Sequence, residues 1–316
     1  MGKTAVLLMA YGTPRSPEEI EPYYTDIRGG RKPTSENLRE LVGRYQRIGG
    51  KTPLLEITRA QANALQALLG DEYKVYIGMK HWHPYLAQAV EEIAQDGLHS
   101  AIAVALAPHY SRFSIDGYIQ RVTDAIQNSK APLQVTFVRS WNVHPLFLSA
   151  VAEKMEAQRK AFGVSWDQIN GVFSAHSLPE RILASNDPYP QELRETCEEI
   201  ATRIGLGQWR FAYQSAGRTG EKWLGPEILE TLDEIAEANG CNGSEKRETK
   251  TGAKCRVLIA PIGFVADHLE VLYDIDVECA ERARALGIEM RRIESPNANP
   301  QFIAALAAIV RENMSL

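Results

Sequence analysis

Apolar and polar positions along this chain form two kinds of pattern, short apolar runs and longer amphipathic stretches. Eight short runs are almost continuously apolar, which is typical of strands in a parallel sheet that helices cover on both faces. The runs fall into two groups of four: residues 5–10, 73–79, 101–108 and 133–141, and then 171–176, 209–216, 256–265 and 289–293. The pattern therefore predicts eight strands in two sets.

The amphipathic stretches between these runs predict helices, for example at 83–97, 114–127, 225–240 and 300–313. This alternation predicts an α/β fold with two similar halves, each a parallel sheet flanked by helices. We expect a first domain over residues 1–143, with the helix at 299–316 packing back on it, and a second domain over 144–298. The polar segment 241–255 has a cysteine at each end and is expected to form an exposed loop.

Composition narrows the class of protein. Hydrophobic residues make up 44% of the 316 residues and charged residues 24%, the balance of a soluble globular protein with a sizeable core. A formal net charge of −5 gives no electrostatic reason to expect nucleic acid. No run approaches the length of a membrane span, and the apolar run near the start is better explained as a buried strand than as a signal peptide. Four cysteines are too few for a disulfide scaffold, so we expect reduced thiols and a cytoplasmic protein.

Several predicted strands end in residues that can carry chemistry. In open α/β sheets, ligands bind beyond the carboxyl ends of the strands. Tyr11 follows the first predicted strand, Lys80 and His81 follow the second, and His176 ends the fifth. Glu270 follows the seventh, and no Gly-rich phosphate-binding motif is present. These residues predict a site for metal binding and proton transfer.

His176 by itself has two interpretations of similar weight. It can be a hydrogen-bonded histidine at a strand end, or an imidazole that binds metal or accepts a proton near neutral pH.

The acidic stretch that follows the seventh predicted strand also has two interpretations. If the chain is helical from Ala266, then Glu270, Asp274 and Glu278 are spaced four apart and share one face. Such a stripe is either a solvated acidic face or a row of oxygen ligands for a divalent cation. Its position at a strand end favours metal binding. Basic clusters that include Arg28 and Arg44 are either solvated helix ends or partners for substrate carboxylates.

Six ordered motifs resemble those of the ferrochelatases, which insert Fe²⁺ into a porphyrin. They are MAYGTP from Met9, YYTDIRGGRKP from Tyr23, RYQRIGGKTPL from Arg44, LAPHYSRFS from Leu106, FSAHSLPER from Phe173 and PIGFVADHLEVLYDIDVEC from Pro261. The resemblance spans nearly the whole chain. It implies two Rossmann-like domains of the chelatase type, with the active-site cleft between them.

The resemblance also implies roles for individual residues. His176 and Glu270 match the catalytic pair, and Tyr11 matches the residue that contacts the metal from the opposite face in the Gram-positive type of the family. His176, Glu270, Asp274 and Glu278 match metal-binding positions, the last two those of an outer site for a hydrated Mg²⁺. The positions that match porphyrin-lining residues are Tyr11, Arg28, Arg44, Tyr45, Thr52, Lys80, His81 and Tyr118.

The resemblance further implies the substrate, partners and cofactors. Tyr11 and the basic segment 28–32 favour coproporphyrin III, with protoporphyrin IX as the alternative substrate. The competing functions are insertion of another metal into a related tetrapyrrole and a non-catalytic tetrapyrrole or metal carrier. We expect Fe²⁺ as substrate, no tightly bound cofactor and no 2Fe-2S cluster, since a C-terminal cysteine cluster is missing. We also expect a monomer that does not insert into membranes and that passes its product to a downstream haem-pathway enzyme.

Overall fold

The computed structural model describes residues 3–217, 220–241 and 255–314. The chain divides into two compact units. The first comprises Met1–Phe147, Val265–His268 and Pro296–Leu316, and the second comprises Leu148–Phe264 and Leu269–Ser295. The first stretch of the first unit ends at Phe147, four residues after the expected boundary at 143. The segment 265–268, which was expected in the second domain, belongs to the first unit. Most of the loop expected at 241–255 lies outside the described residues.

The first unit is built on a parallel sheet of four strands in the order β2-β1-β3-β4. These strands are β1 (Thr4–Ala10), β2 (Tyr73–Met79), β3 (Ser100–Ala105) and β4 (Gln134–Val138). The central strand β1 pairs with β2 and β3, so Leu7 lies opposite Tyr76 on one side and Ala103 on the other. Residues 5–10 are all buried, which explains why this run is apolar throughout.

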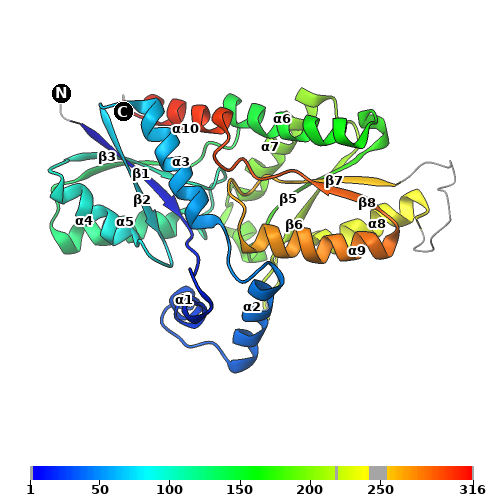
Figure 1. Cartoon of the computed structure of the whole chain (residues 1–316), viewed down its shortest axis with the longest axis horizontal. Helices are drawn as coiled ribbons and strands as arrows, with labels where there is room; N and C mark the ends of the chain where they lie inside the picture. The colour runs from blue at the N-terminus through cyan, green and yellow to red at the C-terminus, as the bar shows by residue number, and fades with distance from the viewer. Residues whose placement is uncertain (1–2, 218–219, 242–254, 315–316) are drawn as a thin grey trace. The chain divides into compact units, whose positions relative to one another are not determined.

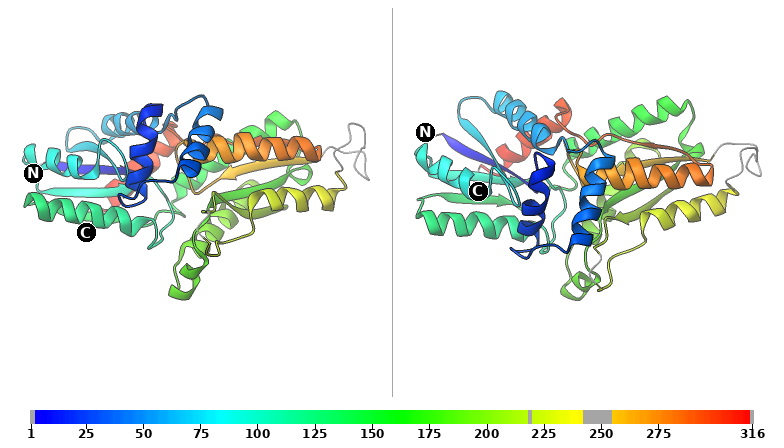
Figure 2. Two further views of the ribbon diagram at one scale, coloured as in Figure 1. Left: turned by 90° about the horizontal axis from the view of Figure 1, so that it is seen from below. Right: turned by 60° about the horizontal axis from the view of Figure 1, so that its bottom comes forward.

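Helices cover both faces of this sheet (Figure 1). One layer contains α3 (Leu54–Leu69) and α10 (Pro300–Glu312), which pack on each other, and the other contains α4 (Leu86–Gln95) and α5 (Ile115–Ser129). Two further helices that also contact each other lie away from the sheet in the same unit, α1 (Ile20–Ile27) and α2 (Ser35–Arg47). Figure 2 shows the same two layers from other sides.

The second unit repeats this plan with the strand order β6-β5-β7-β8, again all parallel. Its strands are β5 (Asn170–His176), β6 (Trp209–Gln214), β7 (Arg256–Pro261) and β8 (Glu289–Arg292). Its helices are α6 (Pro145–Phe162), which starts in the first unit, α7 (Tyr189–Ile204), α8 (Ile228–Asn239) and α9 (Ala280–Leu286). All eight predicted strands are present, and the α/β fold class is confirmed.

Two expectations about the segment after β7 are wrong. The strand stops at Pro261 rather than at residue 265, and Ile262 and Gly263 form a turn. A Cβ atom at Gly263 would lie 2.7 Å from Cβ of Ala175, so this turn packs too closely on β5 for any other residue. The helix then begins at Leu269 rather than at Ala266, and residues Val271–Cys279 form a π-helix.

The sheets bring the expected chemistry to their carboxyl ends. Tyr11 directly follows β1, Lys80 and His81 directly follow β2, and His176 is the last residue of β5. Among the described residues, no helix is long and apolar enough to cross a membrane.

Candidate active site

His176 and Glu270 face each other in the second unit. The Nε2 atom of His176 lies 3.6 Å from Oε1 of Glu270, and each side chain is about one third exposed (32% and 31%). This distance is longer than a direct hydrogen bond. The pair therefore presents a nitrogen and an oxygen across a short gap that solvent can reach.

The surroundings of His176 fix which of its nitrogen atoms carries the proton. Nδ1 contacts the carbonyl oxygen of Ser177, which can only accept, so Nδ1 donates. Nε2 of the neutral ring then carries the lone pair that faces Glu270. The backbone is held as well, since the hydroxyl of Tyr189 donates to the carbonyl oxygen of His176 at 2.9 Å. His176 is thus oriented as a proton acceptor or metal ligand.

The remaining acidic residues of the predicted stripe lie in the π-helix. Asp274 is only 5% exposed and accepts a hydrogen bond from the hydroxyl of Ser215, so the interpretation of a solvated acidic face is wrong for this residue. Glu278 is half-buried. Across the described parts of the chain, no three His, Cys, Asp or Glu side chains converge as ligands of one metal ion would. π-helices are rare, and those that occur are often found at functional sites.

In the first unit, His81 lies at the centre of a polar cluster after β2. Its Nδ1 is 2.8 Å from Oδ1 of Asp26, and Nη2 of Arg121 is 3.4 Å from the same oxygen. The pKa of His81 is lowered to about 4, mainly by burial; Asp26 opposes this shift, and the positive charges of Lys80 and Arg121 contribute to it. The ring is therefore neutral near pH 7. The Tyr11 ring lies 4.7 Å from the His81 ring between centroids, and Tyr11 is 40% exposed.

Lys80 is a partly buried cation beside this cluster. Its Nζ lies 5.0 Å from the centroid of the Tyr118 ring and 3.4 Å from the carbonyl oxygen of Ser114. A Cβ atom at Gly117 would lie 2.5 Å from Nζ, so the glycine leaves room for the amine. Burial, with a smaller effect of Arg121, lowers the pKa of Lys80 to about 8. Among the described residues no carboxylate pairs with Lys80, which suits it to bind an anionic group.

The other predicted substrate-binding residues lie around α1 and α2. Thr52 and Tyr45 are 4% and 2% exposed, and Oγ1 of Thr13 is 2.8 Å from the Thr52 hydroxyl and 3.5 Å from the Tyr45 hydroxyl. Arg44 forms an ion pair with Glu40 at 3.0 Å. Arg28 follows α1, and its guanidinium lies 5.7 Å from the centroid of the Tyr24 ring.

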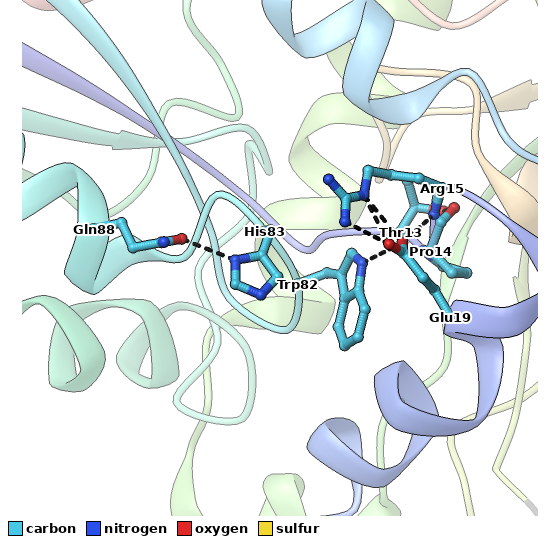
Figure 3. Close-up of polar contacts among 7 residues, drawn as sticks. All are labelled: Thr13, Pro14, Arg15, Glu19, Trp82, His83 and Gln88. Carbon is cyan, nitrogen blue, oxygen red and sulfur yellow. Dashed lines mark hydrogen bonds and ion pairs between the residues drawn. The ribbon is translucent and has the colours of Figure 1, made fainter.

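A network around Glu19 fastens the loops that follow β1 and β2 (Figure 3). Arg15 Nε donates to the Glu19 carboxylate at 3.0 Å, and Trp82 Nε1 donates to it at 2.7 Å. The hydrogen bond from Arg15 is the main cause that lowers the pKa of Glu19 to about 2. Gly12, with a φ of +103°, allows this approach, because a Cβ atom there would lie 2.9 Å from the Trp82 nitrogen. The network therefore supports the loops that carry Tyr11 and His81.

Some of these contacts involve residues that the strand-end argument missed. Asp26 and Arg121 lie in the helices α1 and α5, and Gln214 and Ser215 lie at the end of β6. The motif that contains Asp26 was recognised, but its carboxylate gave no sign of its histidine partner. Gln214 is the last residue of β6, but the predicted run continued to residue 216, so the strand-end rule did not mark it.

The sequence model of the ferrochelatase family matches residues 3–314. The chain belongs to the ferrochelatase family. A ferrochelatase of Herpetosiphon aurantiacus is 45% identical over 98% of this chain and 98% of its own length. A coproporphyrin III ferrochelatase of Halalkalibacterium halodurans is 41% identical over 99% of this chain and 98% of its own. The prediction of a ferrochelatase, an enzyme that inserts iron into a porphyrin in haem biosynthesis, is confirmed.

A solved structure supports the fold independently. The sirohydrochlorin chelatase SirB of Bacillus subtilis subspecies spizizenii, in complex with cobalt, superimposes with a TM-score of 0.62 over 99% of this chain and 96% of that chain. Its sequence is 11% identical, so this likeness concerns the fold alone.

Proposed function

We propose that this ferrochelatase inserts Fe²⁺ into coproporphyrin III and forms Fe-coproporphyrin (coproheme). Relatives at about 40% identity that carry the name coproporphyrin III ferrochelatase support this substrate. Tyr11 and the basic residues that begin at Arg28 also suit a substrate with four carboxylates. The observation that carries the proposed site is the 3.6 Å approach of His176 Nε2 to Glu270 Oε1.

The reaction requires a proton acceptor at the porphyrin. Fe²⁺ replaces the two pyrrole N–H protons of the free base, so each turnover releases two protons. In the neutral tautomer that donates Nδ1–H to Ser177, His176 Nε2 carries the lone pair and accepts a proton as the metal enters. Glu270 receives that proton, which frees Nε2 to accept the second one, or guides the cation, since its carboxylate faces Nε2 across the gap. His176 and Glu270 are the proposed first metal ligands.

Variants of the pair test these roles. We expect His176→Ala and Glu270→Gln each to lower kcat for insertion by about 100-fold or more. Coproporphyrin III should still bind to both variants. Porphyrin fluorescence quenching measures binding and the Soret and Q bands measure insertion. Insertion at the wild-type rate in both variants would contradict the assignment, and a carrier would show binding without turnover even in the wild type.

We propose that porphyrin binding depends on Tyr11, Lys80, His81, Tyr118, Arg28, Arg44, Tyr45 and Thr52. Lys80 is suited to a propionate because it is a partly buried amine with no carboxylate partner among the described residues. The buried hydroxyls of Tyr45 and Thr52 support that surface through Thr13.

Asp274 and Glu278 are proposed to hold a hydrated Mg²⁺ outside the reaction centre. We expect the double variant Asp274→Asn, Glu278→Gln to lose stimulation by Mg²⁺ and to raise the KM for Fe²⁺. Unchanged kinetics at all Mg²⁺ concentrations would contradict this site.

The substrate is tested by anaerobic Fe²⁺ insertion with coproporphyrin III and protoporphyrin IX in parallel assays. We expect rapid insertion into coproporphyrin III and little into protoporphyrin IX. The opposite preference would identify a protoporphyrin ferrochelatase. We further propose a cytoplasmic monomer that passes its product to the next enzyme of the pathway, and gel filtration tests the oligomeric state.

A further inference from the structure

We propose that Gln214 is a positioning residue that sets the separation between His176 and Glu270. This inference rests on the proposed roles of that pair. It concerns a residue that is fully buried, uncharged and without a place in the proton-transfer steps above.

Gln214 occupies the position in the fold from which both members of the pair can be held. It is the last residue of β6 and lies opposite His176, the last residue of β5, in the parallel register. Residues that pair in this way have side chains on the same face of the sheet. Ser174, two residues before His176 on β5, also has its side chain on that face.

Each polar atom of the Gln214 side chain has a partner, and the two partners belong to different elements. The hydroxyl of Ser174 donates to Oε1 at 2.9 Å, and Nε2 donates to the backbone carbonyl oxygen of Glu270 at 3.3 Å. The Gln214 main-chain oxygen accepts from the backbone nitrogen of Ser177 at 2.8 Å. One residue thus connects the strand end at His176 with the backbone of Glu270.

The bond to the Glu270 carbonyl gives the amide its orientation, because a carbonyl oxygen can only accept and so the NH₂ group must face it. Oε1 then points to Ser174, whose hydroxyl donates to it at 2.9 Å. A fully buried amide that lost either partner would leave an unsatisfied polar atom, so the arrangement resists distortion. Glu270 stands immediately before the π-helix and its side chain is about one third exposed. The Gln214 amide therefore holds the backbone at the residue that precedes the π-helix.

The test replaces Gln214 with methionine, which keeps the length of the side chain and removes both hydrogen bonds. We expect kcat for Fe²⁺ insertion to fall about 10-fold to 100-fold, because small misplacements of reacting groups reduce rates by this order. The KM and the dissociation constant for the porphyrin should stay within about twofold of the wild type, because the residues proposed to bind it lie in the first unit.

A second variant weakens the hold on the same amide and leaves Gln214 itself in place. Ser174→Ala removes the hydrogen bond that Oε1 of Gln214 accepts and keeps the bond to Glu270, so we expect a smaller fall in kcat. The double variant should be no slower than Gln214→Met, since Ser174 acts through Gln214. Thr231→Val is the matched control, because Thr231 is a buried residue of the second unit whose hydroxyl donates to the Glu227 carbonyl at 3.0 Å. It should lower the melting temperature and leave kcat unchanged.

The outcomes separate this inference from the proposed function. A wild-type enzyme that inserts no iron into either porphyrin refutes the proposed function. A wild type that inserts iron while folded Gln214→Met inserts it equally fast refutes only the role of Gln214, as does an equal kcat loss in the control. If Gln214→Met does not fold, Ser174→Ala decides, and a wild-type kcat in that variant overturns the inference.

Discussion

The partly buried charge of Lys80 is expected to lower the stability of the folded enzyme and to contribute to binding of an anionic substrate. Lys80→Met keeps an unbranched side chain over the Tyr118 ring and removes the buried charge. A folded-state pKa of about 8 against 10.5 corresponds to about 3 kcal/mol of destabilisation at pH 7. Partial exposure and the lost contact to Ser114 reduce this, so we expect a gain of about 1–2 kcal/mol in the free energy of unfolding.

Urea unfolding as a function of pH gives the decisive comparison. Between pH 8 and 10.5 the unfolded wild type binds a proton at Lys80 that the folded state has released, so its unfolding free energy rises with pH through this window. The stability advantage of Lys80→Met should therefore shrink from pH 8 to 10.5, while its KM for the porphyrin is raised at pH 7. Lys74→Met, in the strand that precedes Lys80, is the control. It loses an ion pair to Asp96 and should be slightly less stable than the wild type. A Lys80→Met enzyme that is less stable than the wild type at pH 7 would refute the reasoning.

Two other predictions concern stability. Gly12→Ala should cost about 1–3 kcal/mol or more, because its φ is +103° and the new Cβ would lie 2.9 Å from the Trp82 nitrogen; thermal unfolding measures this. The control Gly43→Ala in α2 meets no atom within 4 Å and should gain about 0.5 kcal/mol, and equal effects would contradict the steric argument. His109 is 2% exposed and burial lowers its pKa to about 3, so stability that it contributes near neutral pH is lost as the pH falls below 6.5. The contribution of this residue to the slope of the unfolding free energy against pH is at most about 1.4 kcal/mol per pH unit. His109→Gln should remove this contribution, which urea unfolding below pH 6.5 measures. An unchanged slope in the variant would show that other groups cause the loss of stability in acid.

The fold follows from the sequence because its main signal is local. Run 73–79 is a strand with the predicted bounds, and the predicted helix at 225–240 contains α8 at 228–239. The exception is the segment after β7, where a continuous apolar pattern conceals a turn. Packing of Gly263 against Ala175, far away in the sequence, ends the strand there, and apolar periodicity carries no information about it.

The site could be predicted only in part, because many of its contacts also join residues that are far apart in the sequence. His176 and Glu270 could be found because both follow strands and both belong to recognisable motifs. The partners of the site residues could not, because each contact joins distant positions. Asp26 and His81 are 55 residues apart, and Gln214 and Glu270 are 56 apart. The π-helix was also missed, because four-residue spacing suits an α-helix equally well.

The first unit is discontinuous in sequence, and this affects how it folds during synthesis. The helix α10 packs on α3, and its buried residues include Phe302, Leu306 and Val310. Trp141 stacks near Phe302 with ring centroids 6.0 Å apart. The ribosome therefore releases nearly all of the second unit before the last helix of the first unit exists. Domains usually complete folding in the order of their synthesis, but here the unit that begins first can only be completed last. Until α10 is synthesised, the apolar face of α3 that it covers stays exposed. A chaperone that shields apolar surface would act at this stage.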